Sequence, residues 1–307
     1  MRCLVTGATG FIGSHLTQLL LNKGCEVAFL LRPADDLWRI QEYLPSLQVF
    51  EADLLEVKNV SAQIRNFQPQ IVVHAGWYGV DKDQRNHFDQ INYNLYGSLN
   101  LLSECLESGC QYFIGLGSQA EYGQTDKTLE EEMPAQPSTM YGVVKLCTGL
   151  LAQRMCASAG VPFSWLRLTA AYGPKDQPNN LIPYVISSLL QQKEPALTHG
   201  NQKWDYLYID DLINAIWSLI EHPAAQGIFN LSSGRAVPVR HICEIIRGRI
   251  DPRLPLGFGK VLSPAGERMC LEARNDRLRL ATGWEPKISL DNGIEKTIAW
   301  HLSRSHS

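Results

Sequence analysis

Tyr141 and Lys145 are four residues apart near the start of a predicted helix, so their side chains share one helix face. A lysine ammonium beside a phenol favours the phenolate and lowers its pKa from about 10, which gives an acid–base group suited to neutral pH. Ser118 follows a predicted buried strand and could hydrogen-bond to a substrate carbonyl or alkoxide oxygen. The alternatives are two ordinary helix residues and a serine that caps its own turn. Beside a nicotinamide, the three residues predict hydride transfer at a carbinol carbon.

A glycine-rich segment at residues 6–13 has the spacing G-x-x-G-x-x-G and lies between a predicted strand and a predicted helix. Gly7 allows a sharp turn, Gly10 allows a pyrophosphate to approach the backbone, and Gly13 allows close packing of helix on strand. The helix N-terminus then offers free N–H groups to the anion. The alternative is a turn without a ligand, but this context favours dinucleotide binding. The residues expected to contact the pyrophosphate are Gly7, Thr9, Gly10, Phe11, Ile12 and Gly13.

The end of the second predicted strand bears on which dinucleotide is bound. An acidic residue there would hold the ribose 2′-hydroxyl of NAD, but the chain has Leu31 and Arg32. Arg32 could instead bind the 2′-phosphate of NADP through a charge-assisted contact, and Arg39 is a second candidate. The alternative for Arg32 is a solvated surface charge. NADP(H) is therefore favoured, while Asp35 and Asp36 keep NAD(H) open.

Apolar periodicity predicts the elements that position these residues. Buried strands are predicted at residues 2–5, 26–31, 47–51, 71–74, 112–116 and 162–168, and helices at residues 12–23, 57–67, 87–108 and 138–159. This alternation predicts an α/β fold with a doubly wound parallel Rossmann sheet. Later in the chain we expect a helix at 181–191, a strand at 204–208, and a helix up to residue 222 that Asp210 or Asp211 caps.

The pattern changes near residue 170, which suggests two regions. We expect residues 1–170 to form most of the dinucleotide-binding Rossmann domain, with segments around 205–230 returning to it. Residues 171–307 would mainly form a smaller α/β substrate-binding lobe, with the substrate in the cleft between the two.

The composition excludes several classes of protein. The 307 residues are 45% hydrophobic and carry a formal net charge of −3, which gives no basic footprint for nucleic acid or an anionic membrane. No uncharged apolar run is long enough for a membrane helix, and no signal peptide is recognisable, so we expect a cytoplasmic protein. The eight cysteines form no C-x-x-C pair, so reduced thiols and no metal site are expected.

These motifs resemble the NAD-dependent epimerase/dehydratase family, which comprises extended short-chain dehydrogenases/reductases that act mainly on nucleotide sugars. The resemblance covers essentially the whole chain and includes residues 6–13, 52–54, 74–76, 94–97, 167–174, 180–184 and 204–211, besides Ser118, Tyr141 and Lys145. It implies cofactor contacts at Asp53, Leu54, Ala75, Gly76, Asn94, Leu168, Tyr141 and Lys145, with Lys145 on the nicotinamide ribose. It implies substrate contacts at Ser118, Gln119, Asn180 and Trp204.

Several positions leave alternatives open. Trp204 stands where the family commonly has an arginine for the diphosphate, so it either stacks on the substrate or fills the core. Arg268, Lys203 or Lys260 could supply that charge. His74 is a packed strand-end residue or an acid–base group, and Glu121 is a solvated loop acid or a substrate contact.

Departures from the family pattern narrow the expected reaction. The family's 4,6-dehydratases carry an Asp-Glu pair after the active-site hydroxyl residue, and its 3,5-epimerase/reductases carry a cysteine two residues after it; this chain has Gln119 and Ala120. What is left is reduction of a sugar ketone or epimerisation at one carbinol carbon. Arg32 favours NADPH-dependent reduction of a nucleoside-diphosphate-linked 4-keto-6-deoxyhexose, and the segments 118–123 and 283–286 resemble sugar 4-ketoreductases.

The alternatives are a nucleotide-sugar 4-epimerase with tightly bound NAD and a reductase of a non-nucleotide ketone. A redox-sensing or scaffolding module is disfavoured because Tyr141 and Lys145 are both present. The resemblance also implies a homodimer in which the helices at 87–108 and 138–159 of two copies form a four-helix bundle.

Overall fold

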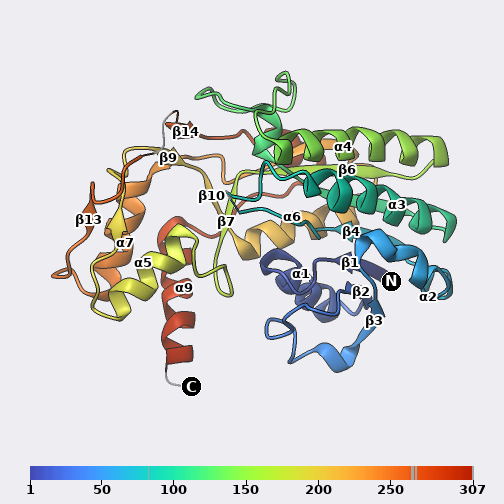
Figure 1. Ribbon diagram of the computed structural model, residues 1–307, viewed down its shortest axis with the longest axis horizontal. Coiled ribbons are helices and arrows are strands. Elements are labelled where there is room, and N and C mark those ends of the chain that lie inside the picture. The colour runs from blue at the N-terminus through green and yellow to red at the C-terminus, as the bar shows by residue number, and fades with distance from the viewer. Residues whose placement is uncertain (82, 264–265, 267, 306–307) are drawn as a thin grey trace.

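A parallel seven-stranded sheet forms the centre of the computed structural model, which describes residues 1–81, 83–263, 266 and 268–305 (Figure 1). The strand order is β11-β6-β5-β4-β1-β2-β3. The strands are β1 (Arg2–Thr6), β2 (Glu26–Leu31), β3 (Leu47–Glu51), β4 (Ile71–His74), β5 (Tyr112–Ser118), β6 (Phe163–Leu168) and β11 (Gly227–Leu231). The expected strands of the first half are therefore present, and residues 227–231 add a strand at the edge next to β6.

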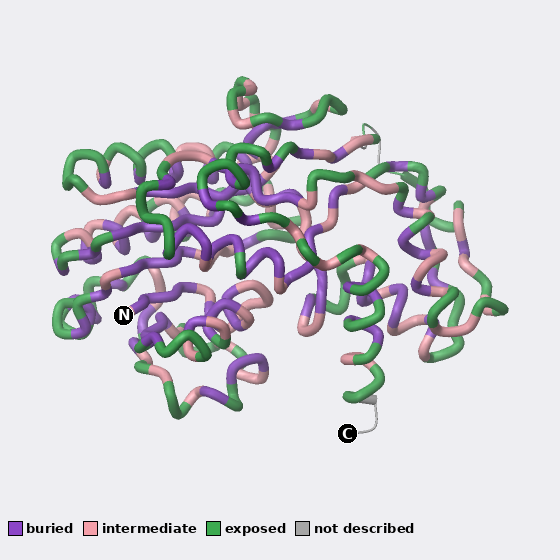
Figure 2. Tube along the Cα trace, turned by 180° about the vertical axis from the view of Figure 1, so that it is seen from behind, coloured by how far each residue is buried: buried purple, intermediate pink, exposed green. Residues whose placement is uncertain are grey.

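Helices cover both faces of the sheet, because the strands are apolar on both sides. Along β1, Cys3 and Val5 pack into one core cluster with residues of α1 (Phe11–Asn22) and α6 (Ile209–Glu221), whereas Leu4 packs into the other. That second cluster includes residues of α2 (Ser61–Phe67), α3 (Gly97–Glu107) and α4 (Met140–Ala159). Figure 2 shows the strands as a buried layer beneath more exposed helices. The predicted doubly wound α/β fold is confirmed.

A smaller C-terminal α/β region lies beside the sheet (Figure 1). Its helices α5 (Leu181–Leu190), α7 (Val239–Ile250) and α9 (Leu290–Ser305) pack on one another. Short strands complete the region: β7 (Ala170–Tyr172) pairs with β10 (Tyr206–Tyr208), β8 (Ala196–Leu197) with β13 (Gly257–Phe258), and β9 (Lys203–Trp204) with both β12 (Val237–Pro238) and β14 (Cys270–Leu271). The helix α8 (Asp276–Thr282) packs against β11.

The expected strand at 204–208 is wrong in one respect. Asp205 interrupts it, so that β9 and β10 belong to different sheets. The expected cap of α6 is also wrong: the N-cap is Tyr208, and Asp210 and Asp211 lie in the first helical turn. There the carboxylates face the positive end of the helix dipole.

Two expected helices are less regular than the periodicity suggested. The segment predicted at 57–67 begins as a 3₁₀ segment, η2 (Leu54–Val60), before α2. The segment predicted at 87–108 contains a π-helical stretch, η3 (Gln90–Tyr96), before α3. A π turn inside a helix is a frequent feature of functional sites.

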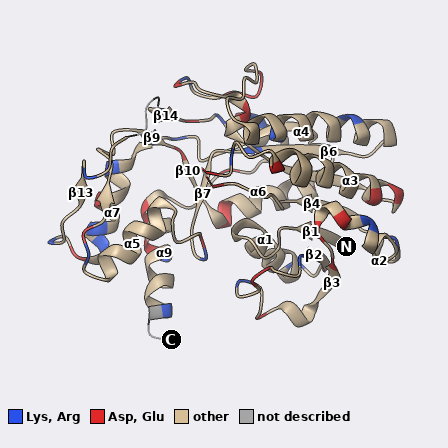
Figure 3. Cartoon of the chain, in the orientation of Figure 1, with Lys and Arg blue, Asp and Glu red and all other residues tan. Residues whose placement is uncertain are grey.

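Charged side chains of both signs are spread over the described ribbon (Figure 3). Among its helices, none combines the length and the apolar character that crossing a membrane requires.

Candidate active site

The glycine-rich turn after β1 is shaped by close backbone contacts. Gly7 has a φ of +71°, and a Cβ there would lie 2.8 Å from the Cα of Gly76. A Cβ on Gly13 would collide with the Gly7 carbonyl oxygen. Gly10 is the N-cap of α1 and makes no side-chain cap, so the first turn of the helix presents backbone N–H groups. The turn therefore has the cradle shape that an anion at a helix N-terminus requires.

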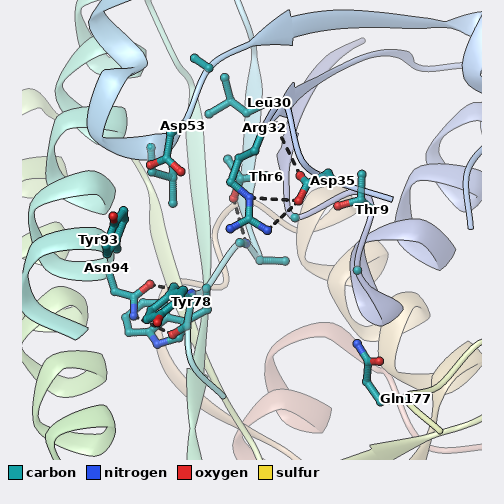
Figure 4. A pocket seen from close by; sticks show the side chains of 17 residues that line it. Thr6, Thr9, Leu30, Arg32, Asp35, Asp53, Tyr78, Tyr93, Asn94 and Gln177 are labelled. Atoms are coloured by element: carbon teal, nitrogen blue, oxygen red, sulfur yellow. Dashed lines mark hydrogen bonds and ion pairs between the residues drawn. The ribbon is translucent and has the colours of Figure 1, made fainter. Parts of the chain in front are cut away.

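A pocket at the carboxyl ends of β1, β2 and β4 includes this turn (Figure 4). The predicted cofactor residues that line it are Gly7, Thr9, Gly10, Arg32, Asp53, Leu54, Ala75, Gly76 and Asn94. It is also lined by residues for which no role was predicted: Thr6, Leu30, Ala52, Trp77, Tyr78, Tyr93 and Gln177, besides Asp35. Trp77 and Tyr78 directly follow the predicted His-Ala-Gly turn, which was the available signal for them; Gln177 comes from a distant loop.

Phe11, Ile12, Gly13, Leu168, Tyr141 and Lys145 are not among the residues that line this pocket. Phe11, Ile12 and Gly13 form the first turn of α1. Leu168 pairs with Ser118 in the sheet and so lies beside the catalytic residues.

The pocket end formed by the β2 strand differs from the sequence expectation. The Arg32 guanidinium is ion-paired with Asp35, with Nη2 at 2.6 Å and Nε at 3.0 Å from Asp35 Oδ1 (Figure 4). An acidic residue therefore lines the pocket after all, three positions beyond Arg32. Arg39 is buried outside the lining, with its Nε donating to the Lys175 carbonyl oxygen. Arg32 is thus already neutralised where a 2′-phosphate would need its charge.

Tyr141 and Lys145 lie on one face of α4 and are both buried. Thr139 caps this helix, its hydroxyl oxygen accepting from the Gly142 N–H at 3.1 Å. The Lys145 ammonium donates to the Leu116 carbonyl oxygen at 2.5 Å and lies 3.5 Å from the centroid of the Trp77 ring. Burial lowers the pKa of Lys145 to about 7, although the nearby Glu121 carboxylate opposes the shift.

The expectation that Lys145 lowers the pKa of Tyr141 is wrong for this structure. Burial raises the pKa of the Tyr141 phenol, against smaller lowering effects from the Ser118 hydroxyl and the Arg85 guanidinium. The Lys145 ammonium is 6.0 Å from the Tyr141 ring centroid and is directed at Leu116 and Trp77 instead. Tyr141 is therefore a neutral proton donor at physiological pH.

Ser118 ends β5 and is positioned by Glu121. The Ser118 hydroxyl oxygen accepts from the Ala120 N–H at 3.1 Å, so the predicted turn cap is present, and the same hydroxyl acts on Tyr141. Glu121 is fully buried; it accepts from the Ser118 N–H at 2.8 Å and forms an ion pair with Arg167 at 2.7 Å. Both sequence alternatives for Glu121, a solvated acid and a substrate contact, are wrong.

His74 and Asn94 support the site from the side of β4 and η3. His74 hydrogen-bonds to Thr6 Oγ1 at 2.7 Å and to Ser98 Oγ at 2.8 Å. Burial, together with Lys145, lowers the pKa of His74 to about 3, so it packs as a neutral residue rather than acting as an acid–base group. The Asn94 side chain accepts from the Tyr78 N–H at 2.8 Å and donates to the Tyr78 carbonyl oxygen at 2.9 Å.

The predicted substrate residues are dispersed. Gln119 lies next to Ser118 and accepts from Arg268 Nη1 at 2.5 Å, so Arg268 brings a cation to the catalytic end. Asn180 is exposed at the start of α5 and donates to Asp176 at 2.8 Å. Trp204 packs against the core clusters, 6.5 Å from Tyr206 between ring centroids, which favours the core alternative.

The other two candidate cations are placed away from Ser118. Lys260 pairs with Glu194 near β13, and Lys203 is exposed in β9.

Comparison with known proteins agrees with this site. The model of the NAD dependent epimerase/dehydratase family matches residues 3–232. A probable dTDP-glucose 4,6-dehydratase of Sinorhizobium fredii is 28% identical, covering 98% of this chain and 93% of that protein. A dTDP-4-dehydro-6-deoxyglucose reductase of Escherichia coli is 24% identical over 96% of each chain.

Among solved structures, UDP-glucose 4-epimerase of Thermus thermophilus in complex with NAD superposes with a TM-score of 0.87 at 25% identity, covering 98% of each chain. The family model spans most of the sequence, and the fold and the Ser118–Tyr141–Lys145 group agree with it. The chain is therefore an enzyme that belongs to the NAD-dependent epimerase/dehydratase family.

Proposed function

We propose that this enzyme epimerises a nucleoside-diphosphate sugar at C4 and keeps NAD bound throughout. The observation that carries the choice of cofactor is the Arg32–Asp35 ion pair in the pocket. A 2′-phosphate would meet the Asp35 carboxylate beside Arg32, whereas a ribose 2′-hydroxyl could donate a hydrogen bond to that carboxylate. The NAD in the Thermus thermophilus epimerase is in keeping with this choice.

The residues of this chain fit a dinucleotide, since the glycine turn, the helix N-terminus and the acid Asp35 line one pocket. When bound, NAD supplies the hydride acceptor and returns the hydride. Tyr141 exchanges the proton of the substrate hydroxyl, taking it as the ketone forms and returning it as the second epimer forms. Ser118 holds the same oxygen, and Lys145 supplies the positive charge that favours the phenolate. The reaction is redox-neutral.

The second candidate is the NADPH-dependent reduction of a nucleotide-linked 4-keto-6-deoxyhexose. Arg32 is half-exposed at the pocket and could exchange Asp35 for a phosphate. The likeness to the reductase of Escherichia coli is in keeping with this candidate. A non-nucleotide ketone is less favoured, because Arg268 supplies a cation beside Ser118 that a neutral substrate does not require.

Replacing Tyr141 by Phe tests the shared chemistry. We expect kcat for interconversion of UDP-sugar C4 epimers to fall about 10²–10⁴-fold, because the proton exchange is lost, while the Kd for NADH stays within about threefold. Tyr93→Phe is the matched control, since Tyr93 also lines the pocket but is half-exposed and distant from α4 in sequence. Turnover within tenfold of the unmodified enzyme would exclude the proposed role of Tyr141.

Analysis of the nicotinamide released on denaturation separates the two candidates. Near-stoichiometric NAD supports the epimerase. Release of NADP(H), or an empty protein that binds NADPH far better than NADH, supports the reductase.

A homodimer is the second part of the proposal. The outer surface of α4 exposes Val143, Leu150 and Leu151, and Tyr96 at the end of η3 is also exposed. Such a patch on two neighbouring helices is suited to pairing with a second copy. Sedimentation velocity should give twice the chain mass, and Leu150→Glu should shift it to the monomer.

A further inference from the structure

Two segments that are far apart in the sequence meet beside the phosphate-binding turn. One is residues 32–43, which follow β2 and carry the pocket residues Arg32 and Asp35. The other is residues 173–177, which follow β7 and carry the pocket residue Gln177. Figure 4 shows Gln177 across the pocket from Tyr93 and Asn94.

Arg39 and Lys175 join these segments through reciprocal hydrogen bonds. Arg39 Nε donates to the Lys175 carbonyl oxygen at 2.9 Å, and Lys175 Nζ donates to the Arg39 carbonyl oxygen at 2.9 Å. Arg39 Nη1 also donates to the carbonyl oxygen of Thr9, in the phosphate-binding turn, at 3.4 Å. We call this set of contacts the clasp.

The backbone at the clasp is constrained. Lys175 has a φ of +66°, in the left-handed region that side chains other than glycine rarely adopt. Such a conformation persists only where surrounding contacts hold it. The preceding carbonyl, of Pro174, is hydrogen-bonded to His15 Nε2 of α1 at 2.8 Å. The 173–177 segment is thus held against α1 as well as against Arg39.

The clasp is also tied to the C-terminal helix. Trp38 is stacked between the guanidinium of Arg39, at 4.4 Å from the ring centroid, and that of Arg304 in α9, at 4.8 Å. The Trp38 and Trp300 ring centroids are 6.4 Å apart. Opening the clasp therefore separates residues 32–43 from two other parts of the chain together.

We infer that Arg39 and Lys175 are positioning residues that keep the dinucleotide in its pocket between turnovers. The clasp joins the segments that carry Asp35 and Gln177 and contacts the turn that would hold the pyrophosphate, so release of the dinucleotide requires these segments to part. The inference rests on the proposed function, since an epimerase must retain its cofactor whereas a reductase must exchange it.

The release rate of the dinucleotide tests the inference. NADH-loaded protein is mixed with a large excess of NAD, and the loss of protein-bound NADH fluorescence is followed by stopped flow. Arg39→Gln and Lys175→Gln should each raise the release rate constant about tenfold, the effect of losing about one hydrogen bond from a charged group. Lys175→Arg, which keeps a donor and a positive charge, should restore most of the retention.

Arg240→Gln is the matched control. Arg240 also donates to a backbone carbonyl, that of His199 at 2.9 Å, and stacks on Phe258 at 3.8 Å, but it belongs to α7. Its release rate should equal that of the unmodified protein. Thermal unfolding identifies any variant that fails to fold, in which case the other clasp variant decides.

Unchanged release in the folded clasp variants, or equal acceleration in Arg240→Gln, would overturn the inference. If the unmodified protein binds NADPH but not NADH, the epimerase proposal fails, and the same comparison with NADPH still decides on the clasp. If it binds neither dinucleotide, both proposals fail.

Discussion

Two carboxylates of this enzyme are completely buried, and their surroundings differ. Glu121 lies at the catalytic end of the sheet and Asp205 at the junction of the C-terminal segments, and each has an exposed fraction of 0%. Glu121 is paired with a charged guanidinium, that of Arg167. The printed partners of Asp205 are backbone N–H groups and one hydroxyl.

The partners of Glu121 are close to the chemistry. It accepts from the Ser118 N–H at 2.8 Å and from the Trp165 indole N–H at 2.9 Å, and its second oxygen faces Arg167. Through these contacts a buried ion pair determines where the backbone of the active-site serine lies. Charge is stabilised here by an opposite charge.

The partners of Asp205 come from two later segments of the chain. Ser233 donates from its N–H at 2.8 Å and from its hydroxyl at 2.6 Å, while the Gly234 and Ala273 N–H groups donate at 3.1 and 3.4 Å. Burial raises the pKa of Asp205, against the lowering effect of these donors. The comparison teaches that a buried acid in this enzyme serves architecture in both places, and that its partners determine what it holds.

Glu121→Gln should have the largest effect on stability. The amide keeps one acceptor oxygen but faces Arg167 with an N–H group, which leaves a buried guanidinium without its counter-charge. We expect the free energy of unfolding in urea to fall by about 3–5 kcal/mol. The control Glu130→Gln removes the exposed pair with Arg274 and should lower it by less than about 1 kcal/mol. Equal losses in the two variants would show that Arg167 readily finds another partner.

Asp205→Asn should have a smaller effect. The new NH₂ group would face the Gly234 and Ala273 donors, so we expect a loss of about 1–3 kcal/mol in the free energy of unfolding. Turnover per folded molecule should be nearly unchanged, because the contacts of Asp205 are structural. Loss of turnover at unchanged stability would instead place Asp205 in the chemistry and remove the contrast with Glu121.

The smallest expected effect is on the pH dependence of stability. The pKa of Asp205 is higher in the folded than in the unfolded chain, so between the two values the folded state binds more protons and stability falls as pH rises. Asp205→Asn removes this titration. The stability advantage of the unmodified protein over Asp205→Asn should therefore be larger near about pH 4 than near about pH 8. Ser232→Ala, which removes a hydroxyl bond to Ala273 at the same junction, should show no such trend.

Local patterns predicted the sheet well, because each parallel strand is buried on both faces and is followed by a glycine or polar break. The strands at 26–31, 47–51 and 71–74 agree with the structure residue for residue. The periodicity could not reveal the break at Asp205, since that residue leaves the strand to bind distant N–H groups. Nor could it reveal the π turn at η3, which Asn94 stabilises through its contacts with Tyr78.

The sequence by itself determined the glycine turn and the spacing of Tyr141 and Lys145, because both are features of a single strand–turn–helix unit or a single helix. Only the tertiary structure decided that Asp35 neutralises Arg32 in the pocket, that Trp77 covers the Lys145 ammonium, and that Glu121 is buried against Arg167. These are matters of which side chains from separate elements meet and how much water they exclude. Charge state and pKa depend on that environment, and residue type and spacing do not specify it.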